Sequence, residues 1–194
     1  MGLLVLVLGL VVMLGAHVFV TFRDARAGLM AKFGQNGYRA LFSIVSIVGL
    51  ALIVWGYGQY RAHEWIQIWS PPVFMRHITV GLMLFAVIFF TAAFIPSHIK
   101  TKLKHPMLAS VKTWALAHLL SNGDLGSILL FGGFLAWGVY ARIAAKHRTD
   151  VVLPVAPTGW TNDIIVVVLG IVIYLALGYA FHPMVVGVPV FGRA

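Results

Sequence analysis

The stretch that decides the fold is MGLLVLVLGLVVMLGAHVFVTF, residues 1–22, which contains no charged side chain. As a helix, such a run is long enough to cross a hydrocarbon layer about 30 Å thick. Its apolar residues are continuous and do not alternate with polar ones, which excludes the strands of a transmembrane β-barrel. Because no basic segment precedes it, we expect the run to be retained as a first span and not to act as a secretory signal.

Five further apolar runs follow along the 194 residues, at 40–60, 74–97, 106–122, 125–141 and 164–182. The run 106–122 is the weakest, because Lys112 interrupts it, although a lysine near one end of a span can reach the interface. The sequence therefore predicts an all-α, polytopic transmembrane bundle of six spans, or of five if residues 106–122 do not cross. No boundary between domains is visible, so we expect one domain over residues 1–194.

The placement of charge predicts how the chain is oriented. Hydrophobic residues make up 61% and charged residues 10%, and the net charge of +9 comes from short segments between apolar runs, which argues against a nucleic-acid partner. With six spans, eleven basic residues fall on one side and three on the other, and this bias puts the basic loops in the cytoplasm and both termini outside. With five spans the bias weakens to eight against six. The larger group is Arg23, Arg26, Lys32, Arg39, Lys100, Lys102, Lys104, Lys112, Arg142, Lys146 and Arg148, and the smaller is Arg61, Arg76 and Arg193.

Histidine is the unusual component of the composition. The chain has eight histidines, five acidic residues and no cysteine, which excludes disulfides, thiolate nucleophiles, iron–sulfur clusters and thiolate-bound zinc. The acids stand singly, and no motif of a hydrolase or a nucleotide-binding protein is present. An imidazole within a membrane usually has a partner or a ligand. The histidines therefore carry the functional prediction.

Two histidines, His17 and His118, lie within apolar runs. Intramembrane histidine pairs without cysteine suit b-type haem, whose iron takes an imidazole nitrogen on each face, and Arg23 and Arg39 could then pair with the propionates. The simpler interpretation is that both histidines form hydrogen bonds between helices. No function is assigned to His63, His147 and His182, which stand in interfacial segments or at a span end. His77 fits an interfacial residue equally well, and for His98 a position at the end of a span without a function is the preferred interpretation.

Three segments together resemble one family, the NnrU proteins, whose plant relatives include 15-cis-zeta-carotene isomerase. They are GAHVFVTFRDAR around His17, NGYRALFSIVSIVGL after it, and KHPMLASVKTWALAHLLSNGD, which contains His105 and His118. The resemblance implies a multi-pass protein of the bacterial inner membrane, with both termini periplasmic by the charge bias, linked to nitrite and nitric oxide metabolism in denitrification. In the isomerase relatives it implies haem b held by histidines.

Carried over by residue, the resemblance points to His17 and His118 as axial ligands, with His105 as the leading substitute. One physical objection stands beside this pair: in straight, upright spans the two histidines differ in depth by about 10–15 Å. Two other pairings match in depth without any tilt, namely His17 with His105 and His77 with His118.

Three functions are open at this point. The first is a redox-active haem-b membrane protein that senses or processes nitric oxide. The second is an enzyme, a haem-dependent cis–trans isomerase of a carotenoid-like polyene with His105 or Asn122 near the substrate. The third is a non-haem accessory or regulatory subunit. The expected partners are the lipid bilayer, a hydrophobic small molecule or nitric oxide, and either a second copy of the chain or a respiratory protein.

Overall fold

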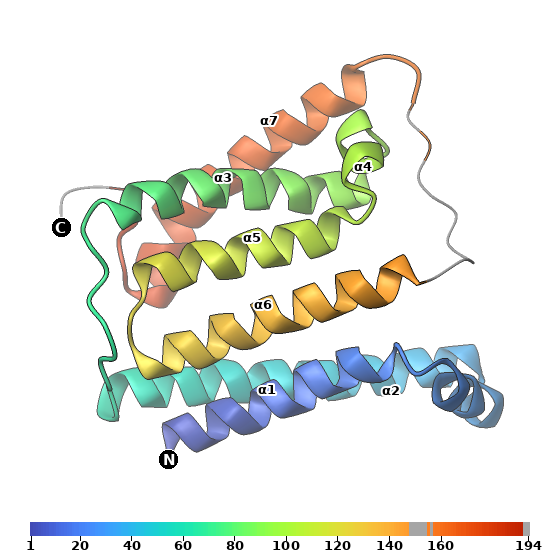
Figure 1. Cartoon of the computed structure of the whole chain (residues 1–194), viewed down its shortest axis with the longest axis horizontal. Coiled ribbons are helices and arrows are strands. Elements are labelled where there is room, and N and C mark those ends of the chain that lie inside the picture. The colour runs from blue at the N-terminus through green and yellow to red at the C-terminus, as the bar shows by residue number, and fades with distance from the viewer. Residues whose placement is uncertain (148–154, 156, 192–194) are drawn as a thin grey trace. The chain divides into compact units, whose positions relative to one another are not determined.

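The computed structural model describes residues 1–147, 155 and 157–191, and every regular element in this part of the chain is a helix (Figure 1). Five helices there are long and apolar enough to cross a membrane, with Thr161–Val186 counted as one, which confirms the all-helical prediction. Arg148 and Arg193, used in the charge count, lie outside the described residues. The elements are α1 (Gly2–Phe19), α2 (Arg23–His63), α3 (Met75–Phe94), α4 (His98–Leu103), α5 (Pro106–Ser121), α6 (Leu125–Lys146), α7 (Thr161–Ala176) and the π-helix η1 (Leu177–Val186).

The fourth predicted span corresponds to α5, which has 16 residues. At 1.5 Å per residue it is about 24 Å long, shorter than the hydrocarbon layer, so it is not one of the five long helices. The choice between five and six crossings therefore stays a prediction. The chain packs as two compact units, the first containing α1, α2 and α6 and the second α3, α4, α5, α7 and η1.

In the first unit, α1 and α2 run antiparallel with their backbones in close contact at glycines. A Cβ added at Gly56 would lie 2.3 Å from the backbone nitrogen of Leu6, and one at Gly9 would lie 2.6 Å from that of Ile53. Such small residues let membrane helices approach closely where burial of apolar surface provides no driving force. The glycines of this seam recur every seven residues on each helix, at Gly2 and Gly9 on α1 and at Gly49 and Gly56 on α2.

The start of α1 is held by Glu64, which follows the last residue of α2. Its carboxylate accepts hydrogen bonds from the N-terminal ammonium of Met1, from the N–H of Gly2 at 2.6 Å and from that of Leu3 at 3.1 Å. The ammonium, followed by these backbone donors, lowers the pKa of Glu64 to about 2. The contact also satisfies N–H groups that have no partner within the helix.

The segment expected as a basic loop, residues 23–39, is helical, so that prediction is wrong. The segment contains no proline, and its apolar residues Leu29, Met30 and Phe33 recur at helical spacing. The helix is interrupted only at Gly34, whose φ of 70° and ψ of 168° define a backbone conformation that glycine adopts readily and other residues rarely adopt. We conclude that α2 consists of a short basic helix and a long apolar one joined at that residue.

The sequence NGD at residues 122–124 forms the connection that leads into α6, and packing and helix capping explain its glycine and its aspartate. A Cβ at Gly123 would lie 1.8 Å from the carbonyl oxygen of Trp69, so only glycine fits, and the Gly123 carbonyl accepts the N–H groups of Ile68 and Trp69. Asp124 is fully buried, and its Oδ1 accepts the N–H of Ser127 at 2.9 Å, which caps the N-terminus of α6.

In the second unit, α3 packs antiparallel against both α5 and α7. Hydroxyl groups mark both contacts, because Ser110 Oγ on α5 donates to the Ala86 carbonyl at 2.7 Å and Thr91 Oγ1 on α3 donates to the Val166 carbonyl at 3.0 Å. Such bonds satisfy polar side chains within apolar helices. This packing fixes α5 and the end of α7 on a common support, α3.

Candidate functional site

His118 lies in the second unit, near the C-terminal end of α5. Its Nδ1 is 2.9 Å from the carbonyl oxygen of Trp114, one turn earlier, and the two rings have centres 5.4 Å apart. A carbonyl can only accept, so Nδ1 carries the hydrogen and the lone pair of the neutral ring is on Nε2. Histidines that bind metals are commonly oriented by such a bond from their second nitrogen.

His182, on η1, lies beside His118. Their ring centres are 6.2 Å apart and their ring planes are inclined by 26°. Nδ1 of His182 is buried and has no hydrogen-bond partner within the described residues. No function is predicted for His182 from the sequence, because it stands at the end of a predicted span, and no pattern in the sequence links it to α5. The packing on α3 of α5 and of α7, which continues into η1, brings the two imidazoles together.

The backbone around His182 departs from the ordinary helix. Residues 177–186 form a π-helix that includes Pro183, and it ends at Gly187, whose φ of 75° lies in the left-handed region. The His182 carbonyl accepts the N–H groups of Gly187 and, at 3.2 Å, of Val188. Because π-helical turns are rare and often occur at functional sites, this geometry directs attention to the residue it positions.

The segment that follows η1 is anchored within the same unit. Arg76, at the start of α3, donates from Nη2 to the carbonyl oxygens of Val190 at 2.9 Å and Pro189 at 3.2 Å. The ring of Phe191 packs 4.6 Å from that of Tyr179 and beside Gly178. These contacts connect residues 189–191, which follow the π-helix, to α3 and to the first residues of the π-helix that carries His182.

His17 belongs to the first unit, where aromatic rings surround it. Its Nδ1 is 2.8 Å from the Met13 carbonyl oxygen, and its ring centre is 5.0 Å from that of Phe42 and 5.4 Å from that of Trp137. Nε1 of Trp137 and the hydroxyl of Tyr38 are buried without a hydrogen-bond partner among the residues described. His17 therefore lies beside the Trp137 ring, whose buried N–H has no partner among the described residues, and its role as an iron ligand stays a prediction.

The other predicted site residues are spread over both units. His105 is half-buried immediately before α5 in the second unit, and Asn122 is half-buried in the first. His77 is exposed in the first turn of α3, as an interfacial residue would be. Arg23 and Arg39 are exposed on α2, in the first unit, and their proposed pairing with propionates stays a prediction.

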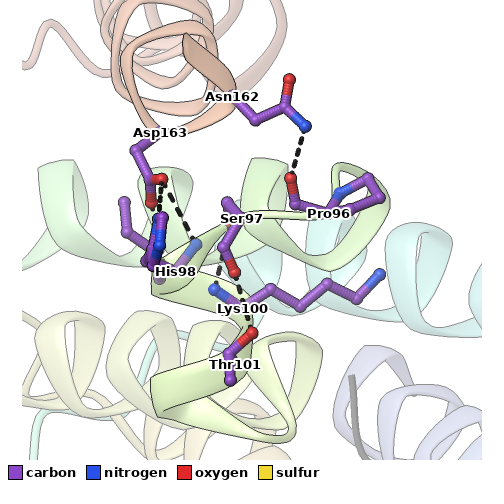
Figure 2. A network of polar contacts seen from close by, with 8 residues as sticks. Pro96, Ser97, His98, Lys100, Thr101, Asn162 and Asp163 are labelled. Carbon is purple, nitrogen blue, oxygen red and sulfur yellow. Dashed lines mark hydrogen bonds and ion pairs between the residues drawn. The ribbon is translucent and has the colours of Figure 1, made fainter. Parts of the chain in front are cut away.

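Figure 2 shows a polar network at the end of α3 that gives His98 a structural role. Oδ2 of Asp163 accepts the ring Nδ1–H of His98 at 2.8 Å and its backbone N–H at 3.3 Å, while Oδ1 accepts the N–H of Ile99 at 3.0 Å. The neighbouring Asn162 donates from Nδ2 to the carbonyl of Pro96 at 2.7 Å. These bonds tie α4 to the first turn of α7, so the network stabilises the second unit.

The comparison with protein families assigns the chain. A model described as NnrU protein matches residues 5–190, nearly the whole length. The chain belongs to the NnrU family. No curated protein and no solved structure matches it.

The NnrU segment 104–124, which carries the most specific part of the resemblance, divides into structural and candidate functional residues. Gly123 and Asp124 are explained by the connection to α6, whereas His118 faces a second imidazole. Within residues 1–147, 155 and 157–191 no three or more histidines and carboxylates gather as a metal site.

Proposed function

We propose that this NnrU protein binds haem b in the membrane through His118 and acts in the metabolism of nitrite and nitric oxide. The observation that carries the proposal is the state of His118, an imidazole on an apolar helix whose Nδ1 is bonded to the Trp114 carbonyl and whose lone pair is on Nε2. The family resemblance supplies the link to denitrification, and the absence of cysteine leaves histidine as the natural ligand type.

Two residues of α5, His118 and Trp114, have separate roles in this proposal. His118 would hold the iron, and Trp114 would orient the imidazole through its carbonyl. When bound, haem supplies one-electron chemistry and a coordination position for a small ligand such as nitric oxide. The chain's own contribution is the orientation, basicity and burial of the imidazole.

Two alternatives stand beside this proposal. The accessory-subunit hypothesis expects His17 and His118 to form hydrogen bonds between helices, and the Nδ1 atoms of both lie within hydrogen-bond distance of carbonyls of their own helices. For the isomerase hypothesis, the catalytic candidates His105 and Asn122 are both half-buried. Neither alternative gains an observation of its own.

The test is an absorption spectrum of the purified full-length protein from haem-replete cells, oxidised and reduced. We expect a Soret band in the wild type, a shifted or lost band in His118→Ala, and an unchanged band in His63→Ala, whose ring is exposed at the end of α2. Wild-type protein that is folded and has no Soret band would contradict the proposal. A deletion strain that reduces nitrite and nitric oxide at the wild-type rate would contradict the metabolic part.

A further inference from the structure

We infer that the short basic helix at the start of α2, residues 23–33, lies in the headgroup layer of the membrane and that Arg26 binds the phosphate of an anionic phospholipid there. The ligand is a phosphodiester with a net negative charge, and the group that holds it is a guanidinium. The inference is independent of the proposed function, because none of its residues is a histidine and its ligand is not haem.

The first argument is the position of this helix at the end of a span. α1 has 18 residues and is therefore about 27 Å long, close to the thickness of the hydrocarbon layer, so its end at Phe19 lies near the headgroups. The short basic helix begins at Arg23, and Figure 1 shows it turned across the direction of α1 and of the long part of α2. Gly34 allows the chain to turn back, since its φ of 70° interrupts the helix. A helix placed crosswise at this depth lies along the membrane surface.

The second argument is the distribution of side chains around the short basic helix. Leu29, Met30 and Phe33 recur at helical spacing and form its apolar face. The rings of Phe22 and Phe33, at the two ends of the helix, are exposed. Exposed aromatic rings beside basic residues are typical of helices that bury one face among acyl chains and hold the other among headgroups. A lipid surface therefore fits this helix better than a soluble acidic partner, which would leave the rings in water.

The third argument is the charge at this end of the first unit. A hydrogen bond of 2.9 Å between Thr21 Oγ1 and the Tyr140 hydroxyl places the C-terminal part of α6 beside the turn that joins α1 to α2. The segments on either side of this contact, residues 20–39 and 140–147, contain one acidic residue, Asp24. Their lysines and arginines are Arg23, Arg26, Lys32, Arg39, Arg142 and Lys146. Such an excess of positive charge next to a bilayer attracts anionic headgroups.

The fourth argument selects Arg26 among these residues, because its guanidinium has no anionic partner. Arg26 is half-buried one turn before Met30, on the apolar face, and its Cζ is 5.7 Å from the centre of the buried Tyr38 ring. Among the residues described, its Nε is buried without a hydrogen-bond partner and its side chain forms no ion pair. A partly desolvated cation of this kind costs free energy unless an anion pairs with it, and a guanidinium matches the geometry of a phosphate.

The experiment measures the binding of single lipids to the full-length protein in a non-ionic detergent by native mass spectrometry. The probes are phosphatidylglycerol, which is anionic, and phosphatidylcholine, which is zwitterionic, and we expect the wild type to prefer the first. Lys32→Gln is the matched control for Arg26→Gln, since both remove one positive charge from the same helix and Lys32 is exposed. Arg26→Gln should bind phosphatidylglycerol at least about fivefold more weakly than the control, the factor that one basic residue contributes at an anionic surface. Arg26→Lys keeps the charge without the planar fork and should also bind more weakly than the wild type.

Three results of this titration would overturn the inference. An equal loss of affinity in Arg26→Gln and Lys32→Gln would show diffuse attraction by the basic segments in place of a site at Arg26. Equal binding of the two lipids by the wild type would show that charge does not select the ligand. Displacement of the bound phosphatidylglycerol by glycerol 3-phosphate in millimolar excess would assign the site to a soluble phosphate and not to a lipid.

A second measurement does not require that the Arg26 variants fold. The chain contains no cysteine, so spin labels can be attached to Phe33→Cys and to Ala31→Cys, which lie on nearly opposite faces of the helix. In lipid discs that contain phosphatidylglycerol, collisions with oxygen and with a water-soluble nickel chelate report the depth of each label. We expect the label of Phe33→Cys among the acyl chains and that of Ala31→Cys in water. Both labels in water would overturn the interfacial position of the helix, whatever the haem content of the protein.

Discussion

The glycine seam between α1 and α2 allows a prediction with a matched control two residues away. Gly56 and Gly58 lie on the same apolar helix, but a Cβ at Gly56 would meet backbone atoms of α1, at 2.3 Å from Leu6 N and 2.8 Å from Val5 C, while one at Gly58 meets nothing within 4 Å. Since ordinary contact needs at least 3.4 Å, Gly56→Ala must move α1 and α2 apart by about 1 Å.

The expected magnitude follows from that displacement. Overpacking of a well-packed interface costs about 1–3 kcal/mol, whereas alanine at the open Gly58 gains up to about 1 kcal/mol from helix propensity. Because both positions are helical, the gain in propensity is common to both variants, and Gly56→Ala should be less stable than Gly58→Ala by roughly 1–3 kcal/mol. The assay is reversible unfolding in mixed micelles with increasing sodium dodecyl sulfate, followed by circular dichroism. Equal stability of the two variants would refute the close packing of these helices at Gly56.

Three further predictions concern charged residues. The folded-state pKa of Glu64, about 2, is below its ordinary value of 4.5, so its stabilising contribution is complete above about pH 4.5 and is lost as the pH falls toward 2; Glu64→Gln should lack this part of the acid sensitivity of unfolding. In a chain without cysteine, single cysteines in place of the exposed Lys102 and Lys146 should be labelled from the same side of the membrane if α5 crosses, and labelling from opposite sides would establish five spans. Asp163→Ala should speed hydrogen exchange at the amides of residues 98 and 99 severalfold by removing their acceptor, and unchanged protection would show that the network with His98 does not anchor α4.

The apolar spans could be predicted from the sequence because hydrocarbon permits only helices with long uncharged runs. The helical form of residues 23–39 could not be predicted from charge, since basic residues were taken as a sign of loops, and its amphipathic spacing was the better signal. The seven-residue spacing of Gly2 and Gly9, and of Gly49 and Gly56, was also present in the sequence and indicates the pairing of α1 with α2.

The candidate site was only half predictable. His118 stands out because an imidazole in an apolar run needs a partner, and the same reasoning identified His17. The position of His182 beside His118 could not be predicted, because the direction of its side chain depends on a π-helix. A period of 3.6 residues assigns the residues within and after such a helix to the wrong face. The role of Asp124 as a buried helix cap was likewise hidden, since the residue stands singly in the sequence and its partners are set by the fold.

The measurement that tests the central claim most directly is the haem content of the purified wild-type protein, determined as the pyridine haemochromogen against protein concentration. A low-spin centre held by two histidines of one chain predicts about one haem b per chain, released by the extraction because no cysteine attaches it covalently. Folded protein from haem-replete cells that contains no haem b would contradict the account.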